Sequence, residues 1–88
     1  MIKGQIKNLM KKIAEIDDFS VEIPEEKAYG DYATNVALIL AKKQGKNPIE
    51  IAENLKTQFS NLKTIGDLFE KIEVVKPGFI NFFLKPEF

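Results

Sequence analysis

Hydrophobic residues recur with helical spacing over the first sixteen positions of the chain. The steps between them are four, three, four and three residues, through Ile2, Ile6, Leu9, Ile13 and Ile16. This spacing predicts an amphipathic helix of about four turns. Lysines repeat every four residues along its flank, at Lys3, Lys7 and Lys11. We interpret these lysines as the solvated side of the helix in preference to a surface that contacts phosphates.

The period of the pattern changes after this helix. Apolar and polar residues alternate over residues 19–23, which predicts a short strand that ends at Pro24. Residues 25–30 are expected to form a loop. Asp31 suits the N-cap of a helix over residues 32–43, which is apolar nearly all round and is therefore expected to be buried. Gly45 follows as a residue typical of a helix C-terminus.

A further helix is predicted from its N-terminal residues. Asn47 can cap it, Pro48 suits the first helical position, and Glu50 stands three residues after the cap. The helix is expected to run to about Phe59, and four of its residues are expected to face inward: Ile51, Ala52, Leu55 and Phe59. With the preceding helix it forms a helical hairpin. Residues 63–67 are expected to form a loop or a short helical turn.

The last third of the chain has the period of strands. Residues 69–76 alternate between apolar and charged side chains, and residues 79–84 form a second apolar segment. Pro77 and Gly78 between them fit a type II turn, so the two segments predict a β-hairpin. The final four residues resemble the start of another helix, which suggests that a longer protein continues beyond them. We therefore expect an α+β fold, with a small, mostly antiparallel sheet of three to four strands and helices packed on one face.

The second hairpin strand offers the best candidate for a binding surface. Side chains alternate along a strand, so Ile80, Phe82 and Leu84 would face the core. The opposite face would carry Phe79, Asn81 and Phe83. Bases in RNA loops are recognised by stacking on aromatic rings and by hydrogen bonds to their edges, which an amide can make. On pattern alone, however, packing of both aromatics under a helix or loop is the favoured alternative, with Asn81 incidental.

Composition narrows the functional classes. The 88 residues contain no cysteine and no histidine, so an enzyme confined to them would have to work with carboxylates and lysines alone. Net charge is zero, with 13 lysines against 13 acids, so any contact with nucleic acid must be local. No signal peptide and no apolar run of membrane-spanning length is visible, so we expect a cytoplasmic protein that binds neither membrane nor DNA.

Three sequence segments in order resemble one known family. Residues 30–35 read Gly-Asp-Tyr-Ala-Thr-Asn, and Gly-Lys-Asn-Pro follows at residues 45–48. Residues 73–82 read Glu-Val-Val-Lys-Pro-Gly-Phe-Ile-Asn-Phe. Together they are similar to the N-terminal additional domain of arginyl-tRNA synthetases. The resemblance covers most of the chain from Pro24 onward, and the first helix matches in character alone.

The resemblance implies that this chain is one domain of a larger enzyme. Residues 1–88 would be the N-terminal tRNA-binding domain, with the catalytic and anticodon-binding domains outside this chain. The whole enzyme would ligate arginine to tRNA-Arg with ATP and magnesium, whereas this part would have no catalytic residue, metal site or cofactor. The catalytic domain and tRNA-Arg would be its partners. The hairpin would hold a D-loop base: Phe79 would stack on it, Asn81 would bond its edge, and Lys76 would lie beside it.

A second class of function uses the same surface differently. Exposed aromatics at Phe79 and Phe83 could anchor a protein partner, or the catalytic domain of the same enzyme, in place of RNA. RNA binding should weaken steeply as salt rises, whereas apolar docking should not. A structure with Asn81 buried against a helix would refute the hypothesis that it reads a base.

Overall fold

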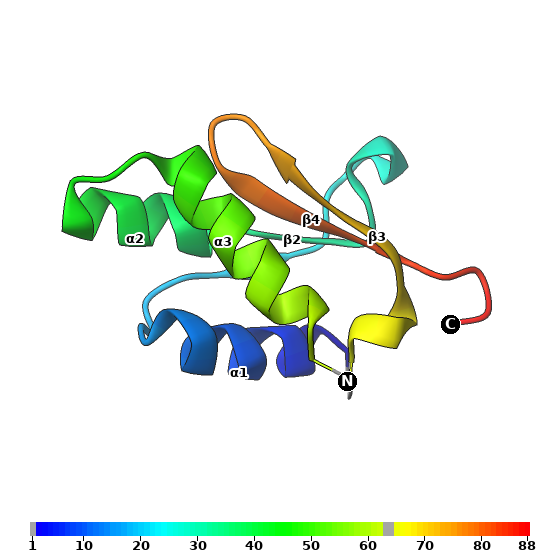
Figure 1. The fold of residues 1–88 in the computed structure, drawn as a ribbon. Coiled ribbons are helices and arrows are strands. Elements are labelled where there is room, and N and C mark those ends of the chain that lie inside the picture. Colours follow the sequence, from blue (N-terminus) through cyan, green and yellow to red (C-terminus); the bar gives the residue numbers. More distant parts are fainter. Residues whose placement is uncertain (1, 63–64) are drawn as a thin grey trace.

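An antiparallel sheet of four strands carries three α-helices on one of its faces (Figure 1). The computed structural model describes residues 2–62 and 65–88. The helices are α1 (Ile2–Ala14), α2 (Val36–Gln44) and α3 (Pro48–Ser60). The strands are β1 (Val21–Glu22), β2 (Tyr32–Thr34), β3 (Phe69–Val75) and β4 (Phe79–Leu84). The α+β prediction is confirmed. None of the helices in these two ranges is long and apolar enough to cross a membrane.

The strand order is β1-β2-β4-β3, and all three pairings are antiparallel. The predicted hairpin is the pair β3 and β4, in which Val75 lies opposite Phe79 and Glu73 opposite Asn81. On its other side β4 pairs with β2, so that Ala33 also lies opposite Asn81. Asn81 therefore lies on a central strand of the sheet, between Glu73 on one neighbouring strand and Ala33 on the other.

Aromatic side chains hold the helices to the inner face of the sheet. Phe59 of α3 is fully buried, and its ring centroid lies 5.1 Å from that of Phe82 and 6.0 Å from that of Phe69. Such ring pairs contribute about 0.5–1.5 kcal/mol beyond their buried area. From α1, Ile6 and Met10 are fully buried. The predicted apolar stripe passed through Leu9, which is half-buried, whereas the structure buries the next residue, Met10. The buried side of α1 is therefore displaced by one position from the prediction.

The predicted start of the second helix is wrong. Residues 32–34 form β2, and α2 begins at Val36. Asp31 does not cap a helix: its backbone N–H donates to the Phe82 carbonyl at 2.8 Å, and its carboxylate accepts from the Leu84 N–H at 2.9 Å. Pairing with β4 outweighs the helical character of the local sequence, because the backbone groups of this segment find their partners across the sheet.

The capping signals of α3 are confirmed. The Asn47 side-chain oxygen accepts from the Ile49 N–H at 2.8 Å and the Glu50 N–H at 3.3 Å, and Pro48 is the first helical residue. These bonds satisfy donors that a helix N-terminus leaves free. Of the four residues expected to face inward, Ile51 is half-buried, and three are buried: Ala52, Leu55 and Phe59.

The hairpin turn differs from the type II turn that we predicted. The Lys76–Pro77 peptide bond is cis, and the Gly78 N–H donates to the Val75 carbonyl at 2.9 Å. Proline is therefore the third residue of the turn, as in type VI. A Cβ on Gly78 would lie 2.8 Å from the Pro48 Cβ and 3.2 Å from a Leu38 methyl carbon, so the hairpin tip packs against α2 and α3.

Two connecting segments complete the chain. The loop expected over residues 25–30 contains a 3-10 turn, η1 (Lys27–Tyr29), which lies beyond the sheet from α1 (Figure 1). Of the loop predicted at residues 63–67, residues 63 and 64 lie outside the described residues, and a second 3-10 turn, η2 (Gly66–Leu68), follows. Residues 85–88 form a turn and not the helix start that we expected.

Candidate nucleic-acid interface

The outer face of the sheet, which is the face opposite the helices, carries the predicted site. Ile80 and Phe82 are fully buried on the inner face, so their neighbours on β4 point the other way. The register places Phe79 opposite Val75, Asn81 opposite Glu73, and Phe83 opposite Lys71. The structure thus brings the three sequence-predicted residues, Lys76, Phe79 and Asn81, to one hairpin, but it does not expose them equally.

Phe79 and Lys76 are accessible at the tip of the hairpin. Phe79 is 38% exposed, and Lys76 is exposed in the turn. Close packing of Gly78 on Pro48 and Leu38 fixes the turn that carries both. A ring held on a rigid strand, next to a cation, can stack on a planar group and attract a nearby phosphate.

Phe83 is engaged within the domain, which agrees with the packing favoured on pattern alone and not with the free ring of the protein-docking alternative. It is half-buried, and the Lys71 ammonium lies 4.4 Å from its ring centroid. Lys71 also pairs with Glu73 at 3.3 Å. Phe79 is therefore the exposed aromatic residue of β4. The alternative in which a protein partner docks on both Phe79 and Phe83 is correspondingly disfavoured.

Asn81 is buried, so the expectation that it lies open on the outer face is wrong. It is 4% exposed, and its Nδ2 donates to the Tyr29 carbonyl oxygen of η1 at 2.8 Å. Its Oδ1 is buried and has no hydrogen-bond partner among the residues that the structure describes. The strand period correctly placed Asn81 on the outer face. It could not show that a distant segment crosses that face and covers the amide.

Gly30 makes this crossing possible. Its backbone has φ 94° and ψ −171°, a region occupied almost only by glycine. A Cβ at this position would lie 2.7 Å from the Phe82 carbonyl oxygen and 3.3 Å from a Phe83 ring carbon. The chain therefore passes directly over β4 at Gly30, and Asp31 then joins the sheet.

Tyr29 is a candidate site residue that sequence reasoning missed. It is 49% exposed, although its carbonyl is bonded to a buried side chain. The available signal was an aromatic residue in a polar loop, directly before the Gly-Asp pair that resembles the family motif. The hydrophobic pattern gives this loop no role beyond connecting two elements.

The lysine flank of α1 has a structural role at one position. The Lys7 ammonium donates to the carbonyl oxygens of Asp17 at 3.2 Å and of Phe19, and lies 3.9 Å from the Phe19 ring centroid. It therefore ties α1 to the segment that leads into β1. Lys7 therefore departs from the solvated side that we predicted for this flank, whereas Lys3 is exposed.

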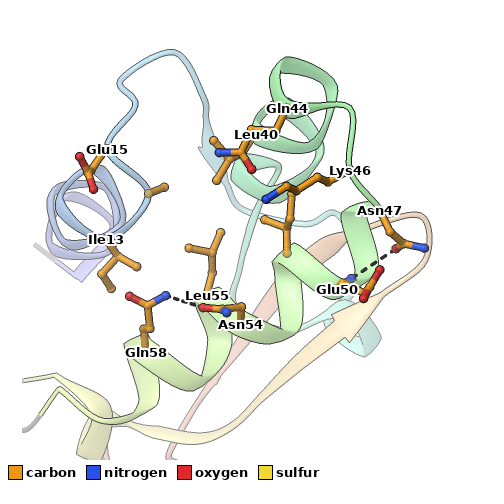
Figure 2. Close-up of a pocket in the computed structure, with 12 residues that line it drawn as sticks. Ile13, Glu15, Leu40, Gln44, Lys46, Asn47, Glu50, Asn54, Leu55 and Gln58 are labelled. Atoms are coloured by element: carbon orange, nitrogen blue, oxygen red, sulfur yellow. Dashed lines mark hydrogen bonds between the residues drawn. The ribbon is translucent and has the colours of Figure 1, made fainter.

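A groove lies elsewhere on the described chain, between the helices (Figure 2). It has a volume of about 580 Å³ and polar walls from α2, α3 and their connection, including Gln44, Lys46, Asn54 and Gln58. In Figure 2 the Gln58 and Asn54 amides point toward each other across one turn of α3. The hairpin residues do not line the groove, so the candidate interface is an open surface and not a pocket.

Comparison with known proteins gives one consistent result. The arginyl tRNA synthetase N terminal domain family matches residues 1–84. The arginine–tRNA ligase of Malacoplasma penetrans is 45% identical over 84 residues, which are 96% of this chain and 14% of that protein. The arginine–tRNA ligase of Caldanaerobacter subterraneus is 47% identical over 73 residues, which are 83% of this chain and 12% of that protein.

Solved structures agree with these sequence matches. The arginyl-tRNA synthetase of Thermus thermophilus superposes with a TM-score of 0.75 at 25% identity, over 99% of this chain and 14% of that one. The enzyme of Plasmodium falciparum gives 0.77 at 25% identity, over 98% of this chain and 16% of that one. The chain thus spans a small part of the length of each relative.

Proposed function

Because the chain belongs to the family of arginyl-tRNA synthetase N-terminal domains, we propose that it binds tRNA-Arg and that its β3–β4 hairpin contacts the D-loop. In this proposal the domain is part of an arginine–tRNA ligase that uses ATP and magnesium, and the catalytic domain of that enzyme is its second partner. The domain itself supplies binding and no chemistry, because it corresponds to the N-terminal domain alone, 14–15% of the length of the ligases that it matches.

The observation that carries the proposal is the exposure of Phe79 on a rigid strand. A partly solvated aromatic ring costs the free domain hydrophobic stabilisation that burial would provide. Its exposure is explained if a base of a single-stranded loop stacks on the ring, a contact worth roughly 1–3 kcal/mol. Loops suit such contacts because their bases are free of pairing and stacking partners.

Lys76 supports a short-range electrostatic contact at the same place. It is exposed in the turn that leads into Phe79, within reach of a phosphate that flanks a stacked base. With zero net charge, the domain would neutralise few phosphates, so its affinity for tRNA is expected to be weak. Asn81 reaches a base edge only if η1 moves away, since its amide nitrogen is bonded to Tyr29.

Titration of labelled tRNA-Arg into the chain tests this proposal. Phe79→Ala should weaken binding by roughly 1–3 kcal/mol. Phe88→Ala is the matched control, because Phe88 is 60% exposed but lies outside the hairpin, and it should bind as wild type does. Substituting abasic nucleotides one at a time in the D-loop should reproduce the loss at one position. Equal binding by wild type and Phe79→Ala would contradict the proposed contact.

A further inference from the structure

Tyr29 combines two properties that are seldom found together. The residue is 49% exposed, yet hydrogen bonds hold its backbone at the N–H, which donates to the Glu26 carbonyl, and at the carbonyl. Its carbonyl oxygen accepts from the buried Asn81 amide at 2.8 Å, and the next residue, Gly30, is packed against the backbone of β4. The three residues of η1 bury no side chain of their own, so the turn adds little to the core. An exposed ring on a fixed support is the arrangement expected of a contact residue.

The position of Tyr29 relative to Phe79 extends this argument. Phe79 and Asn81 are two residues apart on the same face of β4, which corresponds to roughly 7 Å along the strand. Tyr29 is bonded to Asn81, so its backbone lies over the neighbouring position on that face. Four large hydrophobic side chains are exposed in the described part of the chain, and two of them, Tyr29 and Phe79, belong to the two segments that meet at the buried Asn81 amide.

We propose that Tyr29 is a second RNA-stacking residue of this interface, and that Asn81 is the positioning residue that holds it there. This inference rests on the proposed tRNA-binding function. Its ligand is a single-stranded loop with unstacked bases, one on Phe79 and a neighbouring base or ribose on Tyr29. The phenolic hydroxyl can also donate to or accept from a base edge or a 2′-hydroxyl.

The surroundings of Asn81 support this role. The Asn81 amide is 4% exposed, and its one hydrogen bond among the described residues is the bond from Nδ2 to Tyr29. Nδ2 could read a base only if that bond broke, and the buried Oδ1 is out of reach of one. Gly30 opposes movement of η1, because it packs tightly against Phe82 and Phe83. Asn81 therefore acts on RNA through the segment that it fixes.

The first test measures the affinity of tRNA-Arg for single variants of the chain. Tyr29→Ala should weaken binding about 5- to 150-fold, the range for one stacked base, whereas Tyr29→Phe keeps the ring and should stay within about fivefold of wild type. Wild-type affinity of Tyr29→Ala, combined with a loss in Phe79→Ala, would overturn this inference and leave the proposed function intact. Wild-type affinity of both variants would overturn the proposed function itself.

The second test separates positioning by Asn81 from direct reading. In a double-mutant cycle, Asn81→Ala should weaken binding in the wild-type background and have little further effect when Tyr29 is already alanine. Full additivity of the two losses would overturn the positioning role.

An NMR measurement on the unmutated chain avoids any dependence on variant folding. Ring protons of Tyr29 should shift upfield when tRNA-Arg is added, with the half-buried Tyr32 ring as an internal reference. An unchanged Tyr29 signal would overturn the proposal.

Discussion

Replacing Gly30 with alanine should destabilise the domain more than the same replacement at Gly45 or Gly4. The backbone of Gly30 lies in a region that costs other residues about 1–3 kcal/mol. The new methyl group would also lie 2.7 Å from the Phe82 carbonyl oxygen, and forced overpacking of this kind costs about 1–3 kcal/mol more. The expected loss in unfolding free energy is therefore about 2–6 kcal/mol, a large share of the roughly 5–15 kcal/mol by which folded domains are stable.

The two other glycines provide matched controls for this effect. Gly45 has φ 64° but open space where a Cβ would lie, so Gly45→Ala isolates the backbone cost of about 1–2 kcal/mol. Gly4 lies in α1, also with open space, and Gly4→Ala should stabilise by roughly 0.5–1 kcal/mol. Urea unfolding followed by far-ultraviolet circular dichroism measures all three. A midpoint for Gly30→Ala at or above that of Gly45→Ala would refute the account of the crossing over β4.

Three further substitutions test other parts of the structure. Asn47→Ala should lower the unfolding free energy by about 1 kcal/mol in urea, because two N–H groups of α3 lose their acceptor; no change would contradict the cap. Phe59→Ala should cost about 3–5 kcal/mol in thermal unfolding, since the ring is fully buried between Phe69 and Phe82; a loss under 1 kcal/mol would contradict this packing. Lys76→Ala should weaken tRNA binding and reduce the slope of log affinity against log salt by about 0.7–0.9; an unchanged slope would exclude a phosphate contact.

Local signals in the sequence predicted those elements whose determinants are themselves local. The cap at Asn47 and proline at Pro48 marked the start of α3 to the residue, and alternation over residues 79–84 marked β4 and its inner face. In each case the residues that define the element lie within a few positions of one another. The residues that each element buries can then be read from the spacing of its apolar residues.

Long-range pairing explains the errors. Residues 32–34 have helix-compatible composition, but they form a strand because β4, nearly fifty residues further along, offers backbone partners. Asn81 is covered by Tyr29, which lies 52 residues away in the sequence, and no periodicity connects the two. Local signals therefore predicted the hairpin that carries the candidate residues, whereas the burial of Asn81 and its contact with Tyr29 depended on the tertiary fold.

The central claim is that tRNA meets the domain on the outer face of the sheet, at the hairpin and η1. Backbone amide shifts of the ¹⁵N-labelled chain, recorded during titration with tRNA-Arg, test it most directly. The account predicts that the largest shifts fall on residues 27–30 and 76–81. Shifts confined instead to the lysines of α1 at Lys3, Lys7 and Lys11, or to those at Lys42, Lys43 and Lys46, would contradict it.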